Sequence, residues 1–263
     1  MRRWVALAAI AVLAIGCDKK DGGEVKLAPT ASALASSAPP PTAKVVKYTF
    51  DTKSKTSIDM VAPKERIKAF TEGGSGELQI DLMNFTNTRG EAKADLKSIT
   101  MTHWPDAKDN ASQSEHARTW LEVADKLPED VKTPNRWAVF AIRGIEGVSE
   151  PNVTKIPVTK DGADDVRIVT CKAKGEFLVH GHKVDKELEL ELKLRYAPGA
   201  KPDDKPTSID VKTTKPFEVT LAEHDVKPRD DFGKIAKGAF NLLGTKVGEV
   251  ANVSLEFRAT PAP

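Results

Sequence analysis

The chain has 263 residues, of which 40% are hydrophobic and 30% are charged, and its 40 basic side chains nearly balance 38 acidic ones. This length is ample for one large domain with a hydrophobic core, whereas the charge balance argues against a nucleic-acid binder, which usually has a strong basic excess. Two cysteines can supply neither a disulfide framework nor a four-cysteine zinc site.

Residues 1–17 are typical of an export signal. A basic start at residues 1–3 precedes an apolar run over residues 4–15, which is too short for a bilayer-spanning helix of about 20 residues. Residues 13–17, Leu-Ala-Ile-Gly-Cys, resemble the lipobox of bacterial lipoproteins, in which Cys17 would carry the lipid. The alternative is an ordinary cleaved signal with a chance cysteine. We therefore expect an exported protein that Cys17 anchors to a membrane, facing the periplasm or cell envelope.

Residues 18–43 form the next segment and are rich in alanine, serine and proline, without apolar periodicity. Such a segment cannot bury enough apolar surface to offset the entropy lost on ordering. It is predicted to be a disordered tether that leads into a folded domain over residues 44–260.

Most of that domain has the alternation of apolar and polar residues that is typical of β-strands. The clearest case is Glu187–Arg195, where every leucine falls on one face and every charge on the other. Eight to ten strands are predicted, from these segments: Lys44–Met60, Gly76–Leu82, Ala92–Met101, Arg136–Ile145, Val166–Val179, Lys183–Tyr196, Phe217–Leu221 and Val253–Phe257.

Two helices interrupt the predicted strands. Residues 112–115, Ser-Gln-Ser-Glu, have the pattern of a capping box, an apolar stripe follows, and Pro128 ends the first helix. The second is predicted from Asp231 to Leu243, with Gly244 as its stop.

Strands with one charged face and one apolar face are predicted to be antiparallel, because one side of their sheet contacts water. An open sheet would leave its apolar face bare, so a sandwich or a closed barrel remains. The long strands that meet at residues 180–181 favour a tall barrel.

Four segments, taken in order, resemble the YceI-like family: Tyr48–Asp51, Phe177–Lys183, Pro216–Leu221 and Gly244–Val250. This resemblance implies an all-β, lipocalin-like antiparallel barrel of about eight strands, with one or two short helices. It also implies a long apolar tunnel that holds an isoprenoid chain, such as a polyprenyl compound or a quinone-like lipid. The family is largely periplasmic or secreted.

The apolar residues at alternate positions of these strands are predicted to point inward and to form the ligand-binding lining. It comprises Leu78, Ile80, Phe140, Ile142, Phe177, Val179, Leu188, Leu190, Leu192, Leu194, Phe217, Val219 and Leu221. The alternative is a filled barrel, without a small-molecule ligand, whose surface binds another partner. Trp104, Trp120 and Trp137 could line the mouth of a cavity or pack the helix onto the barrel.

No catalytic residues, metal site or cofactor are predicted, although a third hypothesis is an enzyme or redox protein that uses the histidines. His180 and His182 share a face and could ligate a metal with His224, but the parity of His180 predicts an outward side chain in a polar turn. Glu223–Asp225 is interpreted as a charged loop, and Cys171 as a buried, unreactive thiol. The oligomeric state is left open.

Overall fold

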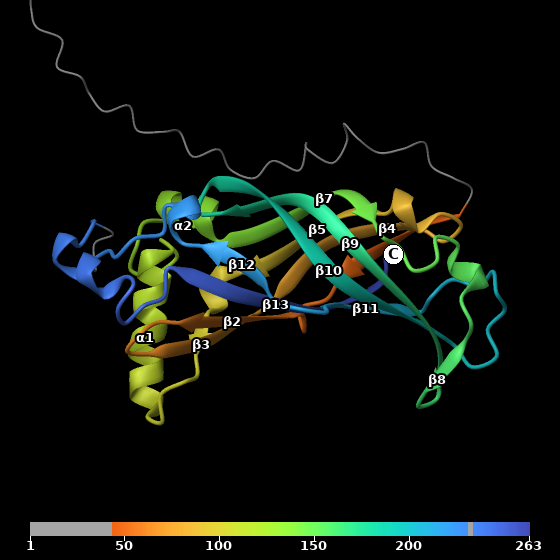
Figure 1. Ribbon diagram of the computed structural model, residues 1–263, viewed down its shortest axis with the longest axis horizontal. Coiled ribbons are helices and arrows are strands. Elements are labelled where there is room, and N and C mark those ends of the chain that lie inside the picture. The colour runs from red at the N-terminus through yellow and green to blue at the C-terminus, as the bar shows by residue number, and fades with distance from the viewer. Residues whose placement is uncertain (1–43, 231–233) are drawn as a thin grey trace, which may run out of the picture.

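The computed structural model describes residues 44–230 and 234–263, so the predicted signal, Cys17 and the tether lie outside the described residues. The described residues form a single sheet of thirteen strands, and all of its pairings are antiparallel (Figure 1). The strands are β1 Val45–Phe50, β2 Lys55–Val61, β3 Arg66–Glu72, β4 Gly74–Asp81, β5 Arg89–Asp95, β6 Thr100–Met101, β7 Trp137–Glu146, β8 Thr159–Asp161, β9 Asp164–Val179, β10 His182–Tyr196, β11 Ser208–Thr213, β12 Phe217–Thr220 and β13 Val250–Pro261. The helices are α1 Ala107–Trp120 and α2 Glu129–Asn135.

Eight of these strands hydrogen-bond in a closed ring. Its order is β1-β4-β5-β7-β9-β10-β11-β13, and β13 pairs with β1 to complete the circuit. The expected lipocalin-like, all-β fold of about eight antiparallel strands is thereby confirmed. Closure gives every strand of the ring a neighbour on both sides, so free edges remain only on the described strands that branch from it, β6, β8 and β12.

Strand β13 changes its neighbours along its length, which widens one end of the molecule. Its C-terminal residues pair with β1 and β11, whereas its N-terminal residues pair with β2 and β12. Strands β3 and β6 continue outward from β2. The molecule thus has a narrow half inside the ring and a wide half between β2–β3, β12 and α1 (Figure 1).

The longest pairing joins β9 and β10, from His182 opposite Val179 to Tyr196 opposite Asp165. A two-residue turn, His180-Gly181, connects them, and both residues have positive φ angles of 51° and 78°, as a type I′ hairpin requires. The leucines of β10 point inward and are buried, as their alternation predicted.

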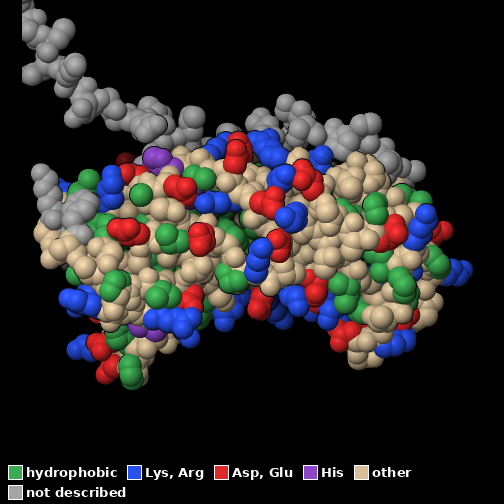
Figure 2. All heavy atoms as spheres, viewed as in Figure 1, with side chains coloured by type: hydrophobic (Ala, Val, Ile, Leu, Met, Phe, Trp, Pro, Cys, Tyr) green, Lys and Arg blue, Asp and Glu red, His purple; other side chains and the backbone are tan. Residues whose placement is uncertain are grey.

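The outward faces of β7, β9 and β10 carry charges of both signs, which Figure 2 shows interspersed over this side of the molecule. Many of them pair across strands, as Lys174 does with Glu146 (2.7 Å) and Lys172 with Glu187 (3.0 Å). The strands therefore have the wet outer face that the sequence predicted.

The first predicted helix exists, but its predicted bounds were wrong. The N-cap of helix α1 lies six residues before Ser112, at Asp106, whose side chain accepts a hydrogen bond from the backbone N–H of Lys108 (2.6 Å). The Ser112–Glu115 segment lies inside α1. The helix ends at Trp120 because Glu122 has a positive φ of 57°, and Pro128 precedes the separate helix α2, which the sequence analysis missed.

The second predicted helix was also wrong over the residues that the structure describes. Residues 231–233 lie outside them, and residues 237–242 form a 3₁₀ helix instead of an α-helix. Three further strands, β3, β8 and β11, were not predicted. Within the described residues, neither helix is long and apolar enough to cross a bilayer.

Candidate ligand cavity

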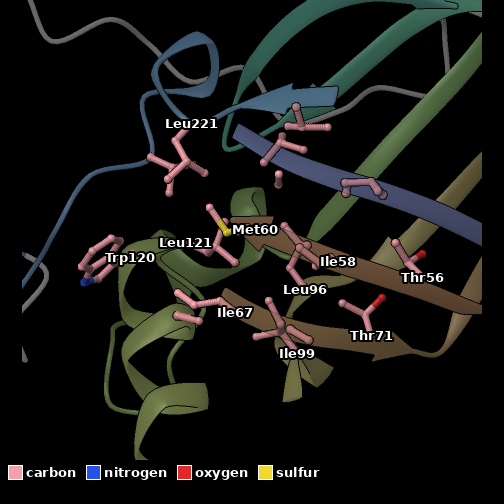
Figure 3. A pocket seen from close by; sticks show the side chains of 18 of the residues that line it. Thr56, Ile58, Met60, Ile67, Thr71, Leu96, Ile99, Trp120, Leu121 and Leu221 are labelled. Atoms are coloured by element: carbon pink, nitrogen blue, oxygen red, sulfur yellow. The ribbon is translucent and has the colours of Figure 1, made fainter. Parts of the chain in front are cut away.

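An apolar cavity of ≈ 170 Å³ lies in the wide half of the molecule (Figure 3). Strands β2 and β3 form one wall, the C-terminal part of α1 forms a second, and β12, β13 and the segment after β12 lie across from them. In Figure 3, Thr56 and Thr71 lie at one end of the cavity, while Trp120 and Leu221 lie at the other.

The walls of this cavity come from inward positions on several strands. On β2 these are Thr56, Ile58 and Met60, and on β3 they are Ile67, Ala69 and Thr71, each set spaced by two residues. No aspartate, glutamate, lysine or arginine is among the described residues that line it. Such walls suit a hydrocarbon ligand, because the transfer of apolar surface from water to an apolar environment is favourable.

The cavity opens between α1 and two loops. On α1, Ala117 and Trp120 are half-buried, and Leu221 and Val247 face them and are also half-buried. Met60, Ile67 and Val253 on the strands behind are buried. The partly exposed residues therefore surround a mouth, and the buried ones form the floor.

The tryptophans divide between the two roles that the sequence left open. Trp104 and Trp120 line the cavity. Trp137 does not, and the guanidinium of Arg136 lies over its ring, 4.9 Å from the centroid.

The narrow half of the molecule is almost filled. It holds a second apolar cavity of only ≈ 40 Å³, at the level of Leu188, Leu190 and Leu192 on β10. Phe50 and Phe257 meet there in an edge-to-face contact with centroids 5.3 Å apart. The inward leucines of β10, Leu188, Leu190, Leu192 and Leu194, form a ladder along the strand. This leucine ladder therefore lies in a packed interior with little free volume.

The predicted lining residues separate into three groups. Four line the wide cavity: Phe177, Val179, Val219 and Leu221. Six line the narrow cavity: Leu78, Phe140, Ile142, Leu188, Leu190 and Leu192. Three are buried in the core and line neither: Ile80, Leu194 and Phe217. Their role in ligand binding stays a prediction.

The walls formed by β2 and β3 were not predicted from the sequence, and on α1 only Trp120 was considered as a lining residue. The period-two set of Ile67, Ala69 and Thr71 was a usable signal, but alanine and threonine make it weak. For α1 the signal was weaker still, because the residues it buries are the polar Ser114 and Thr119.

A buried polar cluster lies beside the cavity and centres on Glu122, whose side chain is only 12% exposed. Glu122 Oε2 lies 2.5 Å from His180 Nε2 and accepts a hydrogen bond from Asn135 Nδ2 (3.3 Å), while Oε1 lies 3.2 Å from Arg229 Nη1. His180 Nδ1 lies 3.1 Å from the carbonyl oxygen of His224. The cluster joins the end of α1, helix α2, the β9–β10 turn and the segment near residue 229.

This cluster corrects the predicted position of His180. Its parity predicted an outward side chain, but His180 is 1% exposed because it lies in the left-handed turn and bends back under α1. The backbone of a turn residue does not follow strand alternation, and this is why the parity argument failed.

Three possible metal ligands, His180, His182 and Asp225, have ligand atoms within 4.8 Å of one another. Both nitrogens of His180 already contact Glu122 and the His224 carbonyl, so a metal would have to displace them. The geometry thus favours a hydrogen-bonding role for His180.

His224 was assigned to a charged loop, but it is fully buried and lines the wide cavity. Its Nδ1 lies 3.1 Å from the carbonyl oxygen of His182, and burial lowers its pKa. Cys171 is buried in the narrow half, where desolvation raises the pKa of its thiol to about 12. A thiol in that state is a poor nucleophile.

No protein-family model and no curated protein matches this chain. Among solved structures, it is similar to a polyisoprenoid binding domain from Saccharophagus degradans implicated in plant cell wall breakdown. That match has 14% identity and a TM-score of 0.50, and it covers 82% of this chain and 99% of that one. BcnA from Burkholderia cenocepacia has 13% identity and a TM-score of 0.44, over 80% of this chain and 99% of that one. The likeness to the first confirms the YceI-like fold that the sequence resemblance implied.

Proposed function

We propose that this protein binds an isoprenoid or another apolar chain in its wide cavity and acts as a carrier, store or sensor without catalysing a reaction. The observation that carries the proposal is the ≈ 170 Å³ apolar cavity, which opens to solvent and has no aspartate, glutamate, lysine or arginine in its described lining. The shared fold adds support, because the similar solved domain is described as polyisoprenoid binding.

The size of the cavity suits this proposal. A dry cavity of about 150 Å³ lined by aliphatic residues is enough to bind benzene, so this one has room for a short branched hydrocarbon segment. Each buried CH₂ contributes about 0.8 kcal/mol before the costs of binding. The rest of a longer ligand would extend out of the mouth beside Trp120, or it would push apart the side chains that separate the two cavities.

The proposal includes export and a lipid anchor at Cys17. It rests here on the basic and apolar pattern of residues 1–17 and on the tether-like composition of residues 18–43. Mass spectrometry of the mature N-terminus, after isolation from a membrane fraction, tests this part separately. A chain that begins elsewhere than Cys17, without acyl groups, would contradict it.

The binding proposal is tested by extraction. The protein is purified from its host without detergent exchange, and its organic extract is analysed by mass spectrometry. We expect a stoichiometric apolar lipid in the wild type and its loss in Ala117→Trp, because Ala117 lines the mouth and an indole there would fill it.

The matched control is Ala111→Trp on the same helix, since Ala111 is exposed and does not line the cavity. It should retain the lipid of the wild type. Equal lipid content in both variants, or no lipid in repeated wild-type preparations, would contradict the proposal.

The alternative is a scaffold that binds another macromolecule and carries no ligand. The nearly filled narrow half, with its ≈ 40 Å³ of free volume, favours it. A wild type that stays free of lipid and takes up none when offered would support this alternative.

A further inference from the structure

His224 is one of the few polar side chains in a mainly apolar cavity wall. It ends the 3₁₀ helix Ala222–His224 and has no exposed surface. Its ring stands edge-on to Phe177, which lines the same cavity, with centroids 5.6 Å apart and planes at 89°. The imidazole is therefore held firmly beside the space that a ligand would occupy.

The hydrogen bonding of His224 defines its tautomer. Nδ1 lies 3.1 Å from the carbonyl oxygen of His182, and a carbonyl can only accept, so Nδ1 carries the proton. Nε2 is buried and has no hydrogen-bond partner among the described residues. Burial lowers the pKa of the ring, more than the neighbouring carbonyls raise it, so the ring is neutral and Nε2 presents a lone pair.

A buried acceptor without a partner is unusual in a folded protein and calls for an explanation. A ligand in this cavity would supply one if it carried a hydrogen-bond donor. The lining favours an uncharged donor, because its described residues include no lysine or arginine that could balance a buried phosphate or carboxylate.

We infer that the ligand is an apolar chain ending in a hydroxyl group, and that this hydroxyl donates a hydrogen bond to His224 Nε2. The inference rests on the proposed lipid binding and adds the chemical class of the ligand. Isoprenoid alcohols fit it, and isoprenoid diphosphates do not.

Three probes with the same hydrocarbon test the inference on the full chain by calorimetry. Farnesol has the donor, farnesyl methyl ether keeps the oxygen but lacks the donor, and farnesyl diphosphate has a charged end. We expect farnesol to bind about tenfold more tightly than the ether, which is the value of one hydrogen bond. The diphosphate should bind more weakly than farnesol.

The variant His224→Phe keeps a ring and removes the acceptor. In it the preference for farnesol over the ether should fall to about one, while the ether binds as it does to the wild type. The control is His103→Phe, because His103 Nε2 is another buried ring nitrogen without a hydrogen-bond partner among the described residues, and His103 does not line the cavity. This variant should keep the wild-type preference.

A preference that survives in His224→Phe, or that is lost equally in His103→Phe, would overturn the inference. Equal wild-type affinity for farnesol and the ether, or tighter binding of the diphosphate, would also overturn it. In these cases the hydrocarbon still binds, so the proposed function stands. If none of the three probes binds the wild type, both proposals fail.

A second measurement tests the inference on the wild type alone, in case the His224→Phe variant does not fold. The ¹⁵N chemical shift of His224 Nε2 in the wild type should move when farnesol is added, and should not move with the ether. A shift that responds equally to both probes would contradict the hydrogen bond.

Discussion

Glu122 has an unfavourable backbone conformation for a residue with a side chain, and its contacts explain why it persists. A positive φ costs a non-glycine residue about 1–3 kcal/mol and persists only where the surrounding contacts impose it, and here φ is 57° just after the end of α1. His180, Asn135 and Arg229 all contact its carboxylate. Glycine would suit the backbone at this position but could not join these four segments.

Glu122→Ala should lower the free energy of unfolding by about 3 kcal/mol, because it leaves His180 and Arg229 buried without the carboxylate. Urea unfolding followed by circular dichroism measures the change. Glu129→Ala is the control, since the Glu129 side chain is 83% exposed and its ion pair with Lys132 is screened by solvent on that side. This substitution should leave stability nearly unchanged. Equal effects of the two substitutions would contradict a stabilising role for the cluster.

The buried His224 gives stability a dependence on pH. Its pKa when folded is lower than the ordinary value of 6.5, because burial disfavours the charged ring. Below about pH 6.5 the unfolded chain therefore binds a proton that the native state does not, and stability falls as the pH falls.

His224→Gln should consequently lose less stability than the wild type between about pH 7.5 and about pH 5.5, because it removes the group that titrates. The measurement is urea unfolding at both pH values. His103→Gln provides a comparison, because burial also lowers the pKa of His103 but its ring is only half-buried, so its effect should be smaller. An unaltered pH dependence in His224→Gln would contradict the assignment.

The β9–β10 hairpin organises the elements around it. Its two-residue turn brings His180 under α1 and sets the register that places every leucine of β10 in the interior. A slip of one residue would turn those leucines to solvent and bury the charges. The turn therefore determines both the ladder and one part of the polar cluster.

Gly181→Ala should destabilise the protein by about 1–2 kcal/mol, because Gly181 has a φ of 78°, which an L side chain resists. Thermal unfolding followed by circular dichroism measures it. The control is Gly144→Ala on β7, where an added methyl group meets nothing within 4 Å, so it should change little. A harmless Gly181→Ala would argue against the type I′ turn.

At the scale of elements, the sequence predicted the long strands and failed on the short and polar ones. Strict alternation over Glu187–Arg195 left no other interpretation, and β10 contains all of it. Strand β3 was missed because its inward residues include alanine and threonine. Helix α1 was misplaced because its buried face is polar, so an apolar stripe beyond its real end suggested a later start.

The site was less predictable than the fold, for a reason that belongs to the whole molecule. Period two identifies which side chains point inward, but it does not reveal how wide the interior is at each level. The width of the interior depends on β13, which pairs with β1 and β11 at its C-terminal end and with β2 and β12 at its N-terminal end. The leucine ladder lies where the ring is narrow and the free volume lies elsewhere.

Leu190→Trp should distinguish the two halves. Leu190 lines the ≈ 40 Å³ cavity, so an indole there overpacks the interior and should cost about 1–3 kcal/mol. Leu190→Met, which conserves volume, should cost less than about 1.5 kcal/mol, and both should keep the lipid content of the wild type. Loss of lipid in Leu190→Trp alone would mean that the bound chain extends into the narrow half.

The length of β10 also governs how an anchored molecule would face its surroundings. At about 3.4 Å per residue, its 15 residues extend roughly 50 Å from the His180 turn beside the mouth to Tyr196. Lys44, the first described residue, lies near that far end, because it pairs with Asp203 in the loop after β10 (2.6 Å). If Cys17 holds the chain to a bilayer as proposed, the predicted tether would join the domain at the end opposite the mouth. The anchor would then leave the mouth accessible to a partner on the side away from that bilayer.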